Sequence, residues 1–177
     1  MKRVIYVNVE KCLACKSCEL ECAVAHSKSK NLFEAIKETP LPQSQVKVEG
    51  ESNSSIPIQC RHCEDAPCIQ ICPTNAIERI DTESPVIINS ELCIGCKQCI
   101  LICPFGVISI SHKGRVAIKC DLCIERLKNN QQPACVEACP TKALQFISLE
   151  ELNKQKRKKV SKEFINGITN SQISKKI

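Results

Sequence analysis

The chain has 177 residues and 43% apolar content, but its aromatic residues are only four Phe and one Tyr. This composition leaves little side-chain bulk for a hydrocarbon core, so another kind of group must organise the interior. Sixteen cysteines fill that role and leave disulfides, zinc and iron–sulfur clusters as candidates. The formal net charge of +6 lies mainly in residues 148–177, which hold eight Lys/Arg and three Asp/Glu. Four bound clusters with their thiolates would each add roughly two negative charges, so the value of +6 does not indicate nucleic-acid binding.

The N-terminal segment MKRVIYVNVEKC predicts a β-strand over VIYVNV rather than a secretory leader, because Asn8, Glu10 and Lys11 interrupt its apolar residues. No apolar run approaches the roughly 18 to 20 residues that a membrane span requires. We therefore expect a protein of the reducing cytoplasm without a membrane span of its own. A disulfide scaffold is disfavoured in that compartment.

The cysteines form four groups of four, which we number quartets 1 to 4 in chain order. Quartets 1 and 3 have the spacing C-x2-C-x2-C-x3-C, which is typical of bacterial ferredoxins. Quartet 2 has two extra residues between its second and third cysteines, and quartet 4 widens that gap to eleven residues. The quartets are Cys12, Cys15, Cys18 and Cys22; Cys60, Cys63, Cys68 and Cys72; Cys93, Cys96, Cys99 and Cys103; and Cys120, Cys123, Cys135 and Cys139.

This spacing has a physical reason. Two residues between thiolates let a tight loop wrap around a cubane cluster while backbone N–H groups turn toward its sulfides. The three-residue step to the last cysteine resembles one helical turn, which carries the fourth sulfur toward a neighbouring cluster. Pro73, Pro104 and Pro140 follow three of these fourth cysteines and end the turn, whereas quartet 1 has Ala23 at this position.

Quartets that exchange their fourth cysteines must work in pairs. Only residues 73–92 separate quartets 2 and 3, so these two form the inner pair and quartets 1 and 4 the outer pair. The repeated runs PTNAIERI, PFGVISI and PTKALQFI after the fourth cysteines suit short strands. The predicted ligand sets are Cys12, Cys15, Cys18 and Cys139 (cluster 1); Cys22, Cys120, Cys123 and Cys135 (cluster 2); Cys60, Cys63, Cys68 and Cys103 (cluster 3); and Cys72, Cys93, Cys96 and Cys99 (cluster 4).

We accordingly predict an α+β fold of two nested, bacterial-ferredoxin-like dicluster domains with short strands and helices, followed by a helical basic tail. The outer domain comprises residues 1–26 and 113–147, and the inner domain residues 60–112. Residues 27–59 form a connector with a short helix near Phe33 and a strand QVKVE, and no chemistry is evident in it. An arm that contacts a partner is the alternative interpretation of this segment. The tail, residues 148–177, is interpreted either as a solvated segment or as a helix that docks on an acidic patch of a partner.

The stretches CKSCELECAVAHS, PIQCRHCEDAPCIQICPTNAI and CDLCIERLKNNQQPACVEACPTKAL resemble the four-cluster iron–sulfur subunits of the dimethyl sulfoxide reductase and formate dehydrogenase type. The resemblance covers residues 3–147 and is strongest to the soluble subunits that serve carbon monoxide dehydrogenase, formate hydrogenlyase and hydrogen-dependent carbon dioxide reductase complexes. It implies the same nested ligation. It also implies anaerobic metabolism and partners that include a catalytic subunit of formate dehydrogenase, hydrogenase or carbon monoxide dehydrogenase type and a second iron–sulfur subunit.

Other interpretations concern single residues and metals. Zinc could bind Cys120, Cys123, Cys135 and Cys139 as a tetrahedral site, although closely spaced quartets would crowd one ion. A solvated loop histidine is the favoured interpretation of His62, with a hydrogen bond near a cluster sulfide as the alternative. His26 and His112 are expected to be structural or exposed. Lys16 and Lys97 are expected to be solvated, with a cation that raises the potential of a nearby cluster as the alternative.

The sequence thus predicts a non-catalytic subunit that relays single electrons through four 4Fe–4S clusters. No Ser/His/Asp set, phosphate loop, or flavin or nicotinamide fingerprint is present. A free-standing, diffusible polyferredoxin is the first alternative, and a zinc-binding interaction or nucleic-acid module the second.

Overall fold

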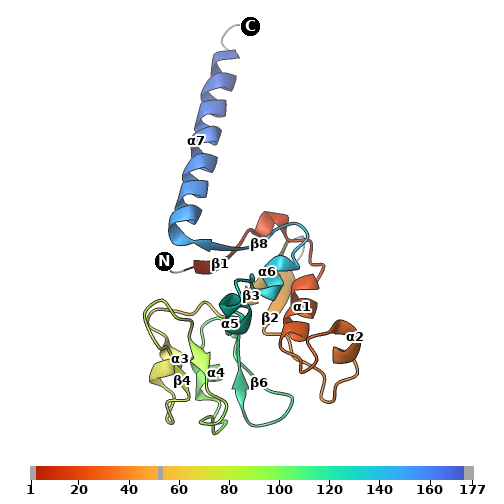
Figure 1. Cartoon of the computed structure of the whole chain (residues 1–177). Coiled ribbons are helices and arrows are strands. Elements are labelled where there is room, and N and C mark those ends of the chain that lie inside the picture. The colour runs from red at the N-terminus through yellow and green to blue at the C-terminus, as the bar shows by residue number, and fades with distance from the viewer. Residues whose placement is uncertain (1–2, 52–53, 174–177) are drawn as a thin grey trace. The chain divides into compact units, whose positions relative to one another are not determined.

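The computed structural model describes residues 3–51 and 54–173, and the side chains of these as far as residue 166. The chain divides into a larger unit, Ile5–Phe146, and a smaller unit that contains the long C-terminal helix (Figure 1). The helices are η1 (Val9–Lys11, a 3-10 turn), α1 (Ser17–Ala25), α2 (Leu32–Ala35), α3 (Pro67–Gln70), α4 (Gln98–Ile102), α5 (Ile124–Lys128), α6 (Ala134–Glu137) and α7 (Leu149–Ile173). The strands are β1 (Arg3–Val7), β2 (Val46–Glu51), β3 (Ser54–Gln59), β4 (Ile77–Glu78), β5 (Ile87–Ile88), β6 (Ser109–Ile110), β7 (Ala117–Ile118) and β8 (Leu144–Ser148).

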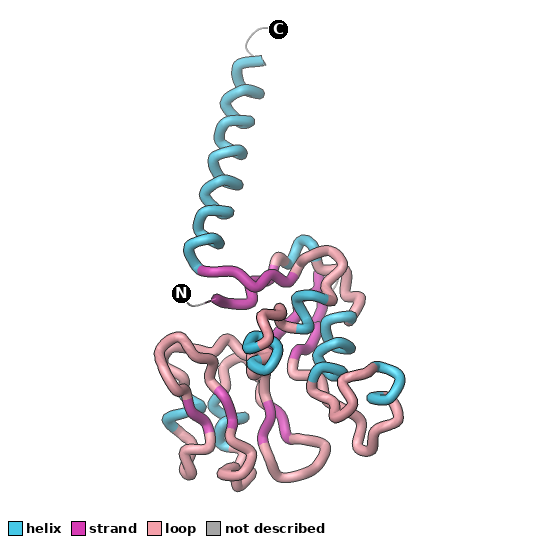
Figure 2. Tube along the Cα trace, viewed as in Figure 1, coloured by secondary structure: helices cyan, strands magenta, loops and turns pink. Residues whose placement is uncertain are grey.

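The strands pair into small two-stranded sheets, β1 with β8, β2 with β3, β4 with β5 and β6 with β7. Most of the larger unit is loop, as Figure 2 shows. The three predicted runs after the fourth cysteines contain β4, β6 and β8, but the first two of these strands are only two residues long. The mixture of short helices and small sheets confirms the α+β class.

The first strand is shorter than predicted. It ends at Val7 because the side chain of Asn8 accepts a hydrogen bond from the N–H of Glu10 and starts the 3-10 turn η1. The N–H of Asn8 donates to the carbonyl of Ala143, 2.8 Å away, directly before β8. This contact holds the segment before quartet 1 against the segment after quartet 4.

The third cysteine of every quartet lies in the first turn of a short helix, α1, α3, α4 or α6. Lys16 and Lys97 precede α1 and α4 in the left-handed backbone conformation, with φ of 58° and 67°. This conformation reverses the chain between the second and third cysteines. The predicted helical turn between third and fourth cysteines is therefore present in the fold.

Two separate apolar clusters form the core of the larger unit. One contains Cys18, Cys22 and Cys135 together with Ile5, Leu144 and Phe146 of β1 and β8. The other contains Cys68 and Cys99 together with Ile77, Val86 and Ile108. Cysteines of quartets 1 and 4 therefore share one core, and cysteines of quartets 2 and 3 share the other.

The connector is more closely tied to the core than its polar sequence suggests. Val46 of β2 is 2% exposed and belongs to the first core cluster. The strands β2 and β3 pair antiparallel from Val46 opposite Gln59 to Glu51 opposite Ser54. The carboxylate of Glu19 on α1 accepts a 2.6 Å hydrogen bond from the N–H of Val48. This hairpin therefore packs beside the helix that carries Cys18 and Cys22.

The smaller unit is built around α7, which confirms the helix predicted for the tail. Ser148 and Glu151 form a capping box, since the Ser148 Oγ accepts from the Glu151 N–H at 3.1 Å and the Glu151 carboxylate accepts from the Ser148 N–H at 3.0 Å. Among the residues that the structure describes, no helix combines the length and the apolar character needed to cross a bilayer.

Candidate metal centres

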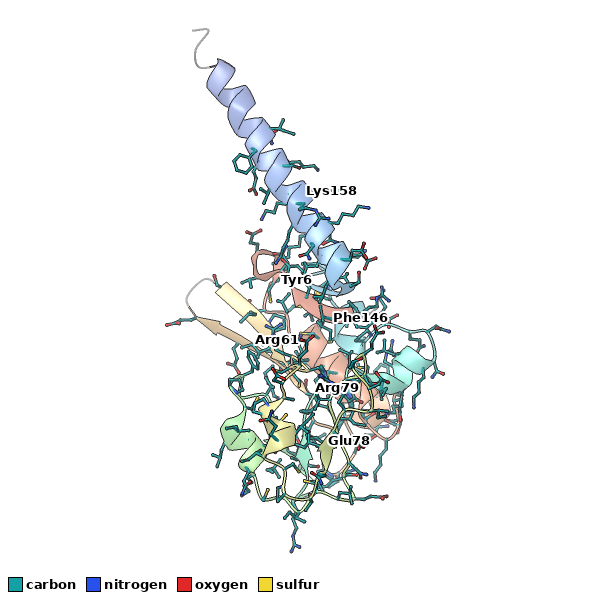
Figure 3. All side chains as sticks on the ribbon, turned by 90° about the vertical axis from the view of Figure 1, so that its left-hand side faces the viewer. Tyr6, Arg61, Glu78, Arg79, Phe146 and Lys158 are labelled. Carbon is teal, nitrogen blue, oxygen red and sulfur yellow. The ribbon has the colours of Figure 1, made fainter. Side chains whose placement is uncertain are left out.

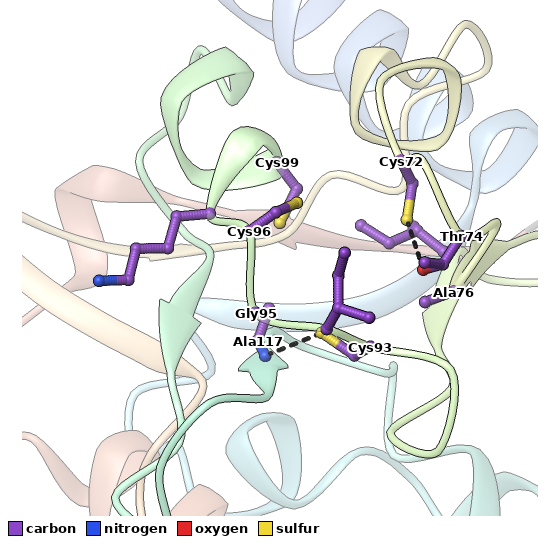
Figure 4. A pocket seen from close by; sticks show the side chains of 11 residues that line it. Cys72, Thr74, Ala76, Cys93, Gly95, Cys96, Cys99 and Ala117 are labelled. Atoms are coloured by element: carbon purple, nitrogen blue, oxygen red, sulfur yellow. Dashed lines mark hydrogen bonds between the residues drawn. The ribbon is translucent and has the colours of Figure 1, made fainter.

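Figure 4 shows a pocket in the second core cluster that four cysteines line. Cys93, Cys96 and Cys99 come from quartet 3, and Cys72 comes from quartet 2. The open space, including the solvent at its mouth, is about 340 Å³. The pocket thus combines three thiols from one quartet with the fourth thiol of another.

A second pocket, of about 350 Å³, has the reciprocal composition. Its lining includes Cys60, Cys63 and Cys68 of quartet 2 and Cys103 of quartet 3, with Pro104 after the last of them. The cysteines predicted for clusters 3 and 4 are therefore brought together in the structure.

In the outer pair, cysteines of quartets 1 and 4 lie close enough for their negative charges to act on one another. Burial raises the pKa of Cys18 to about 11, and the charges of Cys139 and Cys15 act in the same direction. Thr141 contacts the sulfur of Cys139 at 3.8 Å and donates a 2.7 Å hydrogen bond to the carbonyl of Lys11, next to Cys12. Cys139 of quartet 4 therefore lies near the first loop of quartet 1.

The charge of Cys22 acts on the other cysteines predicted for cluster 2. Burial raises the pKa of Cys135 above its ordinary value, and the charges of Cys22 and Cys123 add to that effect. Burial raises the pKa of Cys120 as well, with Cys135 and Cys22 among its neighbouring charges. All four cysteines predicted for cluster 2 are thus close together.

Tight backbone turns allow these loops to curl around their sulfurs. Ala14 and His62 have φ of 53° and 48° within quartets 1 and 2, and Leu122 has 64° within quartet 4. In quartet 3 the corresponding residue is Gly95, with φ of 71°. A Cβ atom on Gly95 would meet the carbonyl oxygen of Arg115 at 2.2 Å. This position therefore requires glycine, the residue without a side chain.

Backbone and hydroxyl donors point at several cysteine sulfurs. The N–H groups of Gln45 and Ala117 donate to Cys22 and Cys93 at 3.3 and 3.4 Å. Ser55 donates its hydroxyl to Cys12 Sγ at 3.3 Å. Gln45 and Ser55 lie in the connector, so this segment, in whose sequence no chemistry is evident, contacts cysteines of quartet 1. Its polar sequence contains no periodic signal that would have revealed these long-range contacts.

His26 lies at the end of α1 and connects the two outer quartets. Its Nε2 is 3.0 Å from Asp121 Oδ1, and its Nδ1 is 2.7 Å from the Cys22 carbonyl and 3.7 Å from Cys22 Sγ. Burial opposes the charged imidazole, but the hydrogen bonds to Asp121 and Cys22 outweigh burial and raise the pKa of His26 to about 11. Burial also raises the thiol pKa of Cys22, yet His26 outweighs that effect and the pKa is lowered.

His62 is not the solvated loop residue that the sequence favours. Its side chain is buried, with a relative exposure of 7% for the residue, and Nδ1 accepts a 3.1 Å hydrogen bond from the Val86 N–H. Burial lowers the pKa of His62 to about 3, and the charge of Lys119 acts in the same direction. In contrast, Lys16 and Lys97 are exposed as expected.

The pockets fit 4Fe–4S groups. Each inner pocket is lined by four thiols, which is the ligand number of a cubane, and nearby N–H groups can neutralise part of its negative charge. Most cysteines are buried or half-buried, and only Cys15 and Cys96 are exposed. The group would supply one-electron chemistry, while the chain fixes its position and limits its contact with water.

Comparison with known proteins finds iron–sulfur proteins among the relatives of this chain. Residues 52–149 match a family model described as a 4Fe-4S dicluster domain. An iron-sulfur protein of Rhodospirillum rubrum is 42% identical over 160 residues, which are 83% of each protein. The electron transport protein HydN of Escherichia coli is 35% identical over 93% of this chain and 100% of its own length. The B subunit of the anaerobic dimethyl sulfoxide reductase of Haemophilus influenzae is 35% identical over 83% of this chain and 74% of its own length.

The sixteen cysteines are consistent with four 4Fe–4S clusters, and the matches agree with the resemblance seen in the sequence. The chain belongs to the 4Fe–4S dicluster family and is an iron–sulfur electron-transfer protein of the kind that serves oxidoreductase complexes.

Proposed function

We propose that the chain holds four 4Fe–4S clusters in the cross-ligated sets predicted above and relays single electrons through them. The composition of the two inner pockets supports this proposal most directly, because each takes three cysteines from one quartet and the fourth from another. The separate cores of the inner and outer pairs support the nested arrangement of domains. Each transfer moves one electron and breaks no bond.

The exposure of the cysteines supports an assignment of the two ends of the relay. Cys15 and Cys96 are the exposed cysteines, and they belong to the proposed clusters 1 and 4. A redox partner can approach these clusters more closely than clusters whose ligands are all buried or half-buried. Electrons therefore enter at one of these two loops and leave at the other.

The partner that supplies or takes the electrons is a catalytic oxidoreductase subunit of formate dehydrogenase, hydrogenase or carbon monoxide dehydrogenase type, with a second iron–sulfur subunit on the other side. The names of relatives support a redox complex, since one is the B subunit of a dimethyl sulfoxide reductase. Anaerobic purification of the chain together with its native partners tests whether it forms a complex with a catalytic subunit. Stable co-elution with a catalytic subunit is expected, whereas a monomer that exchanges electrons only by collision would identify a diffusible polyferredoxin instead.

Serine substitution tests the cross-ligation. Cys72→Ser should alter the electron paramagnetic resonance signal that Cys96→Ser also alters, although Cys72 and Cys96 belong to different quartets. Cys63→Ser serves as the matched control, because Cys63 shares a quartet with Cys72 but belongs to the other proposed cluster. If Cys72→Ser and Cys63→Ser disturb the same signal and leave that of Cys96→Ser intact, each quartet holds its own cluster and the proposal is wrong.

A further inference from the structure

Lys119 is a buried cation directly before Cys120. Its relative exposure is 5%, and its ammonium group donates to the carbonyl of Val86 and, at 3.1 Å, to the carbonyl of Cys120. None of the ion pairs found among the described residues includes Lys119. A buried cation that has only carbonyl partners is costly, so a negative charge is expected close to it.

The position of Lys119 indicates where that charge is located. Cys120 belongs to quartet 4, whereas Val86 lies in the core cluster that contains Cys68 of quartet 2. Burial raises the pKa of the Cys68 thiol, and the positive charge of Lys119 opposes this rise, so the two groups are close enough to interact. The ammonium group therefore lies between a quartet of the outer pair and a quartet of the inner pair.

The surrounding polar groups do not provide the missing negative charge. The carboxylate of Asp121 already accepts from His26 Nε2 and from the Cys123 N–H at 2.8 Å. The Val86 N–H donates to Nδ1 of His62, so the neutral imidazole carries its proton on Nε2, which is buried without a hydrogen-bond partner in the described structure. The guanidinium group of Arg79, which directly follows β4 (Figure 3), donates to the carbonyls of His62 and Cys63 at 2.7 Å and adds positive charge.

We propose that Lys119 is a fixed positive charge between the cluster of Cys120, Cys123 and Cys135 and the cluster of Cys60, Cys63 and Cys68, and that it raises the reduction potentials of both. The inference rests on the proposed function. Reduction adds one negative charge to a cluster, and a nearby buried cation stabilises that charge more strongly than it would in water. Lys119 is thus a positioning residue for electron passage between the outer and inner halves of the relay.

Potentiometric titration followed by electron paramagnetic resonance tests this role. Lys119→Met removes the charge and retains much of the side-chain length. It should lower the equilibrium constant for reduction of two clusters by about tenfold or more, equivalent to about 59 mV for one electron. The two affected signals should be those that Cys120→Ser and Cys60→Ser disturb. Lys119→Arg should keep both potentials close to those of the unmodified chain.

Lys97→Met is the matched control, because Lys97 also adjoins a cysteine, Cys96, but is exposed. It should shift the potentials much less, since water screens its charge. Fully loaded Lys119→Met protein with unchanged potentials would overturn the proposal. Equal shifts in Lys119→Met and Lys97→Met would overturn it as well, because burial would then be irrelevant.

A variant that loads poorly is also informative. Lys119→Gln retains a hydrogen-bond donor without the charge, so it separates the contribution of the hydrogen bonds from that of the positive charge. If Met and Gln both reduce the iron content and Arg restores it, the positive charge stabilises the bound clusters, and the loaded fraction of both variants should show the lowered potentials. If all three variants lose iron equally, Lys119 has a packing role only and the proposal is overturned. In either case the iron content of the unmodified chain, together with the cysteine variants, tests the proposed function separately.

Discussion

At the scale of single residues, Gly95 shows how closely the cluster loops approach the neighbouring backbone. Ala14 occupies the corresponding position of quartet 1 with a positive φ, so the conformation alone tolerates a methyl group. At Gly95, however, a methyl group has no room, because the carbonyl oxygen of Arg115 would lie 2.2 Å from the added Cβ. We expect Gly95→Ala to lose one cluster, which is about a quarter of the bound iron.

Gly106→Ala is the control for that substitution. Gly106 also has a positive φ, 60°, but no atom lies within 4 Å of an added Cβ. This variant should carry only the backbone strain of about 1–2 kcal/mol and keep its full iron content. Anaerobic iron quantitation compares the two variants, and equal iron contents would contradict the role assigned to the Arg115 carbonyl.

The ion pair between His26 and Asp121 is a second residue-scale feature that can be measured. It joins residues 95 positions apart in the sequence, and both side chains are less than one-third exposed. A charged hydrogen bond of this kind contributes about 1.5–3 kcal/mol. His26→Gln or Asp121→Asn should therefore speed the release of iron to a chelator by about tenfold or more.

A double-mutant cycle identifies the cause of that effect. If the ion pair is responsible, the combined variant should release iron little faster than either single variant, because each substitution already breaks the same contact. Multiplicative effects would show that the two residues stabilise the outer centres independently.

At the scale of secondary-structure elements, the hairpin of β2 and β3 supplies a hydrogen-bond donor to quartet 1. Ser55 on β3 donates to the Cys12 sulfur at 3.3 Å, and such donors raise the potential of a cluster. Ser55→Ala should lower the equilibrium constant for reduction of cluster 1 by about two- to tenfold, the equivalent of one net hydrogen bond. Redox titration of this variant against Ser54→Ala, an exposed neighbour, measures the effect. A shift of equal size in both variants would assign it to the hairpin backbone.

The elements also show where sequence reasoning succeeds and fails. Helical turns after the third cysteines and the helix α7 were predictable because local spacing and composition determine them. The short lengths of β4 and β6 were not predictable, because the alternation of side chains does not show how many residues pair with a neighbouring strand. The contacts of Ser55, His26 and Lys119 join residues 33 to 95 positions apart, and no local pattern encodes them.

At the scale of the whole molecule, metal binding should link distant parts of the chain. Under the proposed ligation, cluster 1 joins Cys12 to Cys139, and cluster 2 joins Cys22 to Cys120, so most of the larger unit lies between paired ligands. The buried cysteines would have to lose their protons on binding iron, although burial raises the pKa of Cys18, Cys120 and Cys135. Cluster loading should therefore contribute a large part of the folding free energy.

The helix α7 provides a surface that cluster binding does not use. Its exposed residues include Lys154, Lys156, Arg157 and Lys158, and the apolar side chains of Val160 and Phe164 are 47% and 69% exposed. This mixture suits an acidic partner surface with an apolar centre. Replacing the four basic residues by Gln should weaken binding to the catalytic subunit by about tenfold or more, because exposed ion pairs each contribute a few tenths of a kcal/mol or more.

The measurement is anaerobic co-elution with that subunit at low and high salt, with iron content as the loading control. Binding of the unmodified chain should fall as salt rises, whereas binding of the variant should depend on salt much less. A matched variant in which Lys28, Lys47, Lys113 and Lys128 are replaced by Gln removes the same charge from exposed positions elsewhere. It should bind almost normally. If it binds as weakly as the α7 variant, net charge rather than the helix determines the attachment, and α7 is only a solvated extension.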